Sequence, residues 1–319
     1  MLELREPIDP ELLRTFVAVA ELRSFSAAAQ FLNKTASAVS YRMKALEDQV
    51  GVALLQRTTR SVSLTPSGEL LLEKASHIFD WLRGLPDELQ QVRDGIETQF
   101  TLIINNLLYD AEAAALLLAQ LHERFPLTVL KVRVGVYMGV WDMMLHGGGQ
   151  FAIGAPGFHT ISEEFLTEPL GVVNWVFVLA PGHPLASHPE PLQDDHLRPY
   201  PVVNIEDTSL RLTKRTAWRL AWQPEILVPD LPTKIACHEH GLGVGFLPAP
   251  IAREALAAHR LTERQVLSGR SQSALALAWR RKGAGRVTEH LRTLCGTRDA
   301  LVAPFLRALD PPPQSRENP

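Results

Sequence analysis

The sequence predicts three consecutive parts: a small all-α domain with a winged helix-turn-helix, a long linker helix, and a larger α/β domain. A helix, a short polar turn and a second amphipathic helix occur within the first 50 residues, and a heptad repeat of apolar residues follows. Beyond residue 96, apolar runs of strand length alternate with helical segments. With 319 residues, 46% of them hydrophobic, the chain can fill more than one core.

The first part, expected over 1–65, begins with two packing helices. Leu12, Phe16 and Ala20 have helical spacing in the first, predicted over 11–22. The second is predicted from Ser26, whose hydroxyl suits an N-cap, to Leu32.

A third helix, predicted over about 36–50, follows the polar turn Asn33-Lys34-Thr35 and ends at Gly51. Its buried side is marked by four apolar residues, namely Val39, Met43, Leu46 and Val50. Its other side carries Ser37, Ser40, Tyr41 and Lys44. This second face is therefore free to meet a partner.

The segment 34–60 holds five bases against two acids, a local excess of three, in a chain of net charge −3. Within it, an alternating stretch that starts at Leu55 predicts a short hairpin or wing. A recognition helix places side chains on base edges, while wing and flanking groups bind phosphates. The segment is therefore where DNA is expected to bind.

The candidate DNA-binding residues fall into two groups. We assign base or near-base contacts to Ser37, Ser40, Tyr41 and Arg42, because arginine can grip guanine with two hydrogen bonds and hydroxyls are less selective. Phosphate contacts are assigned to Lys34, Lys44, Arg57, Thr59 and Arg60, with Thr35 of the turn included in the same surface. For each residue taken singly, a solvated surface position is the alternative.

The second part, expected over 66–95, is a linker helix that begins with Thr65 as cap and Pro66 as first residue. A heptad seam runs along it through Leu71, Ala75, Ile78, Leu82, Leu85, Leu89 and Val92. Such a seam predicts pairing with another helix, hence a dimer or a tetramer. Pro86 predicts a kink or a restart. The alternative is an amphipathic helix packed on its own domain.

The third part, expected over 96–309, is an α/β sheet domain. Its strands are predicted at 100–104, 129–136, 172–179, 202–205 and 274–279, with a helix at 111–124. Prolines between 181 and 201 punctuate a loop-rich middle. Residues 310–319 are predicted to be a disordered tail.

A set of spaced residues closely resembles the LysR-type transcriptional regulators. It comprises Ser24-Phe25-Ser26-Ala27-Ala28-Ala29, Ala38-Val39-Ser40, Leu46-Glu47, Gly51, Arg57, Arg60, Leu64-Thr65-Pro66-Ser67-Gly68 and, much later, Gly241 to Pro248. The resemblance implies a DNA-binding regulator whose effector domain, similar to periplasmic binding proteins, has two Rossmann-like subdomains. The chain crosses twice between them, giving subdomains of about 96–168 plus 268–309 and 169–267, with the effector between them. Ala36, Ser37 and Tyr41 depart from the usual family residues, which leaves the operator bases open.

Three further stretches resemble the allantoin-utilisation activators within that family. They are Ile104 to Tyr109, Tyr137 to Asp142, and Val203 to Asp207 running into Leu212 to Arg215. The resemblance suggests a small polar effector, a ureide or its oxoacid breakdown product.

The effector pocket is expected at the turn after the strand 100–104, where α/β sheets bind ligands with free backbone donors. Asn106 and Leu107 are the expected backbone hosts, with the amide of Asn105 beside them. The resemblance places around the same cleft Tyr137, Met138, Gly154, Asn204 and His238, to which Glu206 and Lys214 add charge. Each of these is alternatively an ordinary loop or core polar group.

Enzyme chemistry has little support. Gly241-x-Gly243-x-Gly245 lacks the last spacing of a dinucleotide fingerprint, and His238 and His240 would point to different sides of a helix. Neither a nucleophile elbow nor a phosphate-binding loop occurs. We therefore expect no catalytic residue, cofactor or metal. A small-molecule-binding protein or enzyme with a helical N-terminal extension is the alternative function.

Location and further partners are inferred from what the sequence lacks. No signal peptide and no apolar run of membrane-spanning length occurs, which predicts a cytoplasmic protein without membrane contact. Cys237 and Cys295 support neither a disulfide framework nor a four-ligand zinc site. The expected partners are double-stranded DNA with a pseudo-palindromic operator, a small polar effector and a second copy of the chain. Contact with RNA polymerase is left open.

Overall fold

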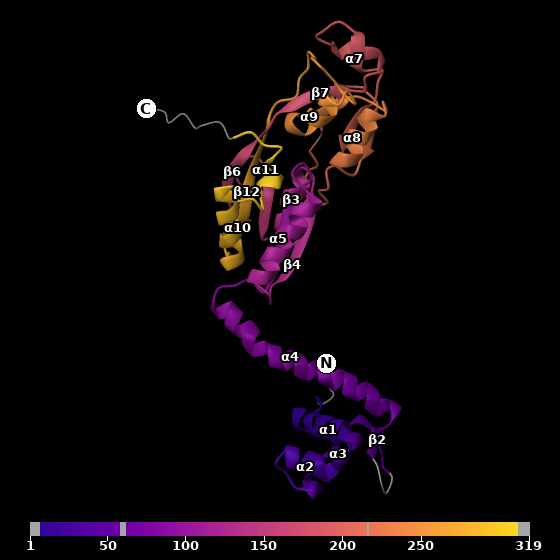
Figure 1. The fold of residues 1–319 in the computed structure, drawn as a ribbon, viewed down its shortest axis with the longest axis vertical. Helices are drawn as coiled ribbons and strands as arrows, with labels where there is room; N and C mark the ends of the chain where they lie inside the picture. The colour runs from indigo at the N-terminus through magenta and orange to yellow at the C-terminus, as the bar shows by residue number, and fades with distance from the viewer. Residues whose placement is uncertain (1–6, 58–61, 216, 312–319) are drawn as a thin grey trace, which may run out of the picture. The chain divides into compact units, whose positions relative to one another are not determined.

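The computed structural model describes residues 7–57, 62–215 and 217–311, and it forms two compact units that divide between Gln90 and Gln91 (Figure 1). In the described ranges, no helix is both long enough and apolar enough to cross a membrane. The first unit contains α1 (Pro10–Leu22), α2 (Phe25–Phe31), α3 (Ala36–Val50), β1 (Leu55–Arg57), β2 (Val62–Leu64) and most of α4 (Pro66–Arg93). The second unit contains all later elements.

The first unit is a winged helix-turn-helix, as predicted. Phe16 and Val19 of α1 pack with Val39, Met43 and Leu46 of α3, and all five are fully buried. β1 and β2 pair antiparallel, with Leu55 opposite Leu64, and so form the wing. The 3.6-residue period of the apolar positions therefore decides which side of α3 is left outside.

The helix ends follow from local hydrogen bonds. Gly51 takes a left-handed φ of 76° after α3, as predicted. The expected N-cap Ser26 is wrong: the N-cap is Ser24, two residues earlier, whose hydroxyl accepts the N–H of Ala27. At α4 the Thr65 hydroxyl accepts the N–H of Gly68, as a cap residue does.

α4 runs without a break from Pro66 to Arg93, so of the kink or restart expected at Pro86 the restart is absent. One proline removes a single N–H donor, and the turns on both sides keep their own bonds. Gly68 lets the first turn approach the wing, since a Cβ there would lie 2.1 Å from the Leu54 carbonyl oxygen. Of the heptad seam, Leu71 and Ala75 are covered within the unit, while Ile78, Leu82, Leu89 and Val92 are exposed large apolar residues.

The second unit begins with a five-stranded sheet of order β4-β3-β5-β12-β6. Its strands are β3 (Gln99–Asn105), β4 (Val129–Gly135), β5 (Phe151–Pro156), β6 (Phe165–Val173) and β12 (Ser273–Arg280). β3 is parallel to β4 and β5, whereas β12 is antiparallel to β5 and β6. Its helices are α5 (Ala111–Arg124), α6 (Met138–His146), α10 (Arg286–Thr297) and α11 (Ala303–Leu306).

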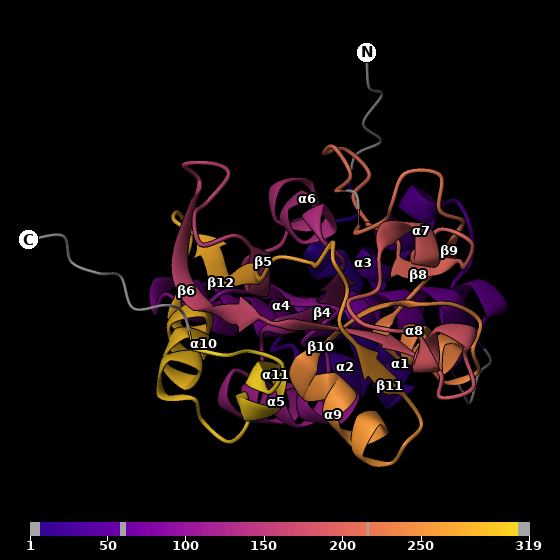
Figure 2. The same ribbon diagram turned by 90° about the horizontal axis from the view of Figure 1, so that it is seen from above.

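Both faces of this sheet are covered. Figure 2 shows α6 on one face and α5 with α10 on the other. Phe100, Leu102 and Ile104 pack toward α5 and α10, while Ile103 packs with Trp141 of α6. Burial on both faces explains why β3 is apolar at consecutive positions.

The second lobe of this unit has two smaller sheets, of order β10-β7-β11 and β8-β9. Its elements are β7 (Trp175–Leu179), the 3₁₀ helix η1 (Pro184–Ser187), α7 (Asp194–Leu197), β8 (Val202–Ile205), β9 (Glu225–Val228), α8 (Leu231–Glu239), β10 (Gly245–Pro248), α9 (Ala249–Ala257) and β11 (Thr262–Arg264). A parallel bridge between Val202 and Val244 links the two sheets. The α/β domain is thus two subdomains, as the fold prediction required.

The chain crosses between the subdomains twice. We expected one extended segment over 172–179, but Asn174 separates β6 of the first sheet from β7 of the second. The return crossing lies between β11 and β12. The two crossings touch, because Gln272 donates to Asn174 at 2.6 Å and Trp175 donates to Ser273 at 3.1 Å.

The end of the chain is partly packed. Asp310, expected to begin a disordered tail, exchanges two backbone hydrogen bonds with Val172 and accepts the Asn174 amide. That expectation is wrong for Asp310, since the bridge extends the edge of the first sheet. Residues 312–319 of the predicted tail lie outside the described residues.

Candidate functional site

The outer face of α3 presents a compact set of polar side chains. Lys34, Ser37, Tyr41 and Lys44 are exposed, and Tyr41 is 76% exposed. Ser37, Tyr41 and Lys44 lie four and three residues apart, so they share one helix face. Thr35 is exposed and is the N-cap of α3, where its hydroxyl accepts the N–H of Ala38. Ser40 is half-buried beside this face.

Arg42 does not belong to this free face. Its guanidinium donates to the Glu11 carboxylate of α1 at 2.9 Å. Arg42 lies three residues after Val39 and four before Leu46, so it borders the buried stripe and faces α1. Arg42 is thus paired with Glu11 in this structure, and its base contact stays a prediction.

Of the candidate DNA-binding residues in the wing, only one lies among the described residues. Arg57 ends β1, and Thr59 and Arg60 lie outside the described residues. The hairpin itself is present as predicted.

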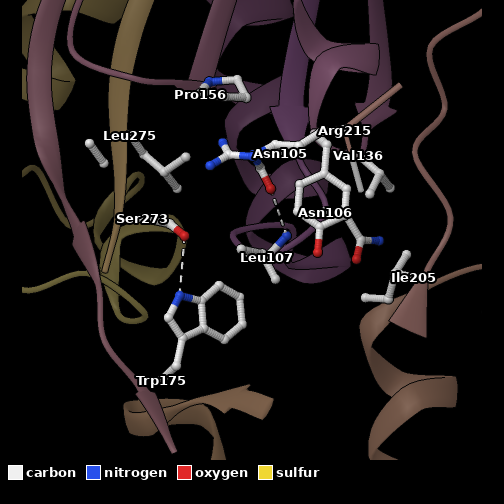
Figure 3. A pocket seen from close by; sticks show the side chains of 12 residues that line it. Asn105, Asn106, Leu107, Val136, Pro156, Trp175, Ile205, Arg215, Ser273 and Leu275 are labelled. Atoms are coloured by element: carbon white, nitrogen blue, oxygen red, sulfur yellow. Dashed lines mark hydrogen bonds between the residues drawn. The ribbon is translucent and has the colours of Figure 1, made fainter. Parts of the chain in front are cut away.

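A pocket lies between the two subdomains of the second unit (Figure 3). It holds about 450 Å³ of space free of atoms, counting its open mouth. Its walls are made by Asn105, Asn106, Leu107, Val136, Tyr137, Pro156, Trp175, Ile205, Arg215, Ser273, Ala274 and Leu275. Trp175, Ile205 and Arg215 come from the second subdomain, whereas the others belong to the first. A ligand here would touch both.

The turn after β3 forms one wall. The backbone N–H of Asn106 donates to the Gly135 carbonyl at 2.9 Å, and that of Leu107 donates to the Asn105 Oδ1 at 3.0 Å. These two donors are thus not free, which corrects their assignment as backbone hosts. The reason is local: asparagine side chains bind the backbone two residues on. The Oδ1 of Asn106 is instead buried without a partner among the described residues.

Tyr137 and Trp175 form further parts of the wall. Tyr137 precedes α6 with φ 47° and ψ −123°, a conformation costly for a residue with a Cβ. Its hydroxyl accepts a hydrogen bond from Arg270 at 3.3 Å. The same guanidinium lies 3.4 Å above the ring of Trp175. Arg270 therefore supports two walls of the pocket from behind.

The loop 207–215, which we call the strap, carries Arg215 from β8 of the second subdomain to the pocket. Asp207, only 4% exposed, accepts the N–H groups of Met138, Gly139, Ser209 and Arg215 at 2.8 to 3.1 Å. Asp142 of α6 accepts those of Leu210 and Arg211. Two carboxylates thus hold the strap on the N-terminal half of α6, where the helix dipole favours negative charge at the first turn.

Gly139 is required for this docking. A Cβ at position 139 would lie 1.9 Å from the Thr208 Oγ1. That hydroxyl accepts the N–H of Val136 at 3.0 Å, so the strap reaches the pocket wall itself. The absence of a side chain at 139 lets the two backbones meet.

Six predicted effector residues do not line the pocket. Asn204 is buried and donates to Trp218 and Glu225, and His238 is buried against the Gly243 carbonyl. Gly154 accepts the Asn105 amide through its carbonyl. Met138 packs with the α6 core. Glu206 and Lys214 pair with each other at 2.7 Å on the surface. Most of their polar groups are thus used within the fold, while the Nε2 of His238 is buried without a hydrogen-bond partner among the described residues.

Four of the residues predicted from the sequence line the pocket, namely Asn105, Asn106, Leu107 and Tyr137. The remaining lining residues were not predicted. Pro156 ends β5, and Ser273 to Leu275 begin β12, so strand ends were a usable signal. Arg215 gave a weaker signal, because a basic residue in a loop is ordinarily a surface residue.

A buried amine lies near this pocket. Lys234 of α8 is 4% exposed and has no ion-pair partner in the described part of the chain. Burial and the neighbouring Arg270 guanidinium lower the pKa of Lys234 to about 7. Burial, and then the nearby Lys234, lower the pKa of His238 to about 3. Both groups are therefore more easily neutral than usual.

The comparisons with known proteins agree with this architecture. Residues 10–69 match the family described as "Bacterial regulatory helix-turn-helix protein, lysR family", and residues 110–300 match "LysR substrate binding domain". The HTH-type transcriptional activator AllS of Salmonella typhimurium is 46% identical over 298 residues, 93% of this chain and 97% of that protein. AllS of Klebsiella pneumoniae is 51% identical over 254 residues, 80% of this chain and 94% of that protein.

Among solved structures, an OxyR mutant of Corynebacterium glutamicum matches with a TM-score of 0.59 and 19% identity, over 95% of this chain and 93% of that one. This likeness shows the fold. The AllS relatives confirm the resemblance to the allantoin-utilisation activators. The chain therefore belongs to the LysR family of transcriptional regulators.

Proposed function

We propose that this chain is an effector-controlled transcriptional activator of genes for the use of a ureide such as allantoin. The observation that carries this proposal is the 46% identity to the activator AllS over 93% of the chain, including both domains. Its test is a footprint of the intact chain on the DNA upstream of its own gene. A protected site, with transcription that rises with a ureide, is the expected result. Failure to retain any of this DNA at physiological salt would contradict it.

The DNA-binding surface of the proposal is the exposed face of α3, with Tyr41 and Ser37 at base edges and Lys34 and Lys44 at phosphates. Arg57, Thr59 and Arg60 remain proposed wing contacts. Since the proposed binding partner is chromosomal DNA, the protein would act in the cytoplasm.

Lys44→Gln is expected to weaken binding to the footprinted site and to unrelated DNA alike. An ammonium on a phosphate releases a counterion, so the slope of log K against log salt should fall by about one. Fluorescence anisotropy at several salt concentrations measures both quantities. Lys131→Gln removes an exposed amine from the other unit and is the control. An unchanged slope in Lys44→Gln would remove Lys44 from the DNA surface.

The exposed apolar residues of the α4 seam support self-association. Leu71 and Ala75, at the start of the seam, pack instead within the first unit. A dimer would bind two half-sites about 34 Å apart, or a multiple of it, so the operator should be a pseudo-palindrome. Assembly of two dimers into a tetramer, and contact with RNA polymerase, are further parts of the proposal.

Leu82→Asp is expected to shift the chain toward monomer, because it places an unpaired charge in the seam at a cost of several kcal/mol. Sedimentation velocity measures the change. Leu70→Asp, the same substitution at an exposed position off the seam on the same helix, should leave the dimer intact. A wild-type monomer, or equal effects of both variants, would argue against the seam.

The pocket between the subdomains is the proposed effector site, with Asn105, Asn106, Leu107 and Tyr137 among its contacts. A ligand that touches both subdomains favours one relative arrangement, and its binding energy is then available to shift the regulator between states. Binding at a hundredfold excess over Kd should stabilise the fold by about 2.7 kcal/mol, which a thermal shift detects.

A further inference from the structure

The lining of the pocket carries charge of one sign. Arg215 is the single charged side chain of the lining, and no carboxylate belongs to the lining. Arg270 contacts the lining residues Tyr137 and Trp175. Lys234 is close enough to Arg270 for the guanidinium to lower the pKa of its amine. None of the three is paired with an acid in residues 7–57, 62–215 and 217–311. The pocket lining therefore carries one positive side chain, Arg215, without an ion-pair partner among the described residues.

The backbone of Arg215 is held at the pocket, where its side chain is exposed. Its backbone N–H donates to Asp207 at 2.8 Å, and Asp207 is itself fixed on α6 by two further N–H groups. Figure 3 shows the Arg215 guanidinium among the lining side chains. A planar guanidinium offers two parallel N–H donors that match a carboxylate, and the carboxylate of a bound ligand would pair with Arg215.

A second unpaired group points to what else the ligand carries. Asn106 is 8% exposed, and its Oδ1 has no hydrogen-bond partner among the described residues. A buried carbonyl oxygen without a donor is costly, and most such groups are satisfied in folded proteins. An N–H or O–H of the ligand would satisfy it. The adjacent side chains of Leu107, Val136 and Leu275 are apolar, so this part of the pocket disfavours a second charged group on the ligand.

We propose that the pocket recognises a small carboxylate bearing an N–H or O–H donor, with the carboxylate on Arg215 and the donor on Asn106. This inference rests on the proposed function and narrows its effector from polar ureides in general to the acyclic, anionic ones and their oxoacid. A neutral cyclic ureide offers Asn106 a donor but leaves Arg215 unpaired.

Allantoin and allantoate form the matched pair for the test, because hydrolytic opening of the allantoin ring adds a carboxylate and keeps the ureide N–H groups. Isothermal titration calorimetry of the full chain should give at least about tenfold tighter binding of allantoate, since a charge-assisted hydrogen bond changes affinity by roughly 10- to 100-fold. Arg215→Gln should abolish this preference, and Arg215→Lys should restore part of it. Arg211→Gln, which removes an exposed guanidinium from the same strap, should keep it.

Glyoxylate, whose hydrate has O–H donors, separates the two proposals. Binding of glyoxylate that depends on Arg215, without binding of either ureide, supports the carboxylate site and contradicts the ureide effector. Binding of allantoin with equal or greater affinity than allantoate overturns the carboxylate site and leaves the ureide effector. A preference for allantoate that survives Arg215→Gln, or no binding of any of the three, overturns the carboxylate site as well.

Discussion

Asp207→Ala is expected to destabilise the second unit by at least about 3 kcal/mol and to abolish effector binding. The carboxylate accepts four backbone N–H groups from α6 and the strap while almost fully buried. Each buried donor left without an acceptor costs about 1 to 3 kcal/mol, although water would reach some of them. Chemical denaturation followed by tryptophan fluorescence measures the loss.

Effector binding should fail in the same variant because Arg215 loses the anchor of its backbone. Asp207→Asn keeps an acceptor oxygen and should recover part of the stability. Asp195→Ala removes an exposed carboxylate that pairs with Arg198 on the surface, and it should change the free energy of unfolding by less than about 1 kcal/mol. If Asp207→Ala is as stable as Asp195→Ala, the strap is not held as described.

Lys234→Met is expected to stabilise the second unit by several kcal/mol at pH 7 and below. Lys234 is buried without an ion-pair partner among the residues described, and methionine fills a similar volume without a charge. Lys234 has a folded pKa of about 7, lowered from 10.5, so the unfolded chain binds more protons between these values. The free energy of unfolding of the wild type therefore rises with pH between these two pKa values, by about 1.4 kcal/mol for each pH unit.

The gain from Lys234→Met should accordingly be largest at pH 7 or below and shrink as pH rises toward 10. Urea denaturation at pH 6, 7, 8, 9 and 10 measures the difference. Lys282→Met, at an exposed position, should show no such trend. A gain that is independent of pH would mean that the Lys234 amine is neutral, or equally charged, in both states. His238, four residues on, adds a separate loss of stability as pH falls below 6.5, because its folded pKa of about 3 is lowered.

The DNA-binding half was predictable because its signals are local. The spacing of Val39, Met43 and Leu46 decides which side of α3 is buried, and Gly51 decides where it ends. The spacing does not show how Arg42 is paired, since a residue at the border of the stripe can reach an acceptor on a neighbouring helix. Glu11 supplies that acceptor from 31 positions earlier.

The effector half was predictable as strands and helices but not as a pocket. Asn204 and His238 are polar residues near strand ends, as ligand-binding residues often are, yet tertiary contacts use them inside the second subdomain. Which polar group finds a partner within the fold is decided by segments distant in sequence, such as Glu225 for Asn204.

The sequence by itself determined the order of the parts, the winged helix-turn-helix, the heptad seam and the family, because each depends on residue type at short, regular spacing. Only the tertiary structure decided that Arg215 belongs to the pocket, that Asp207 holds it there, and that Lys234 is buried without an ion pair in the described chain. These placements depend on how the two subdomains pack against each other after two crossings of the chain. The sequence does not show whether a charged side chain finds an ion-pair partner in that packing.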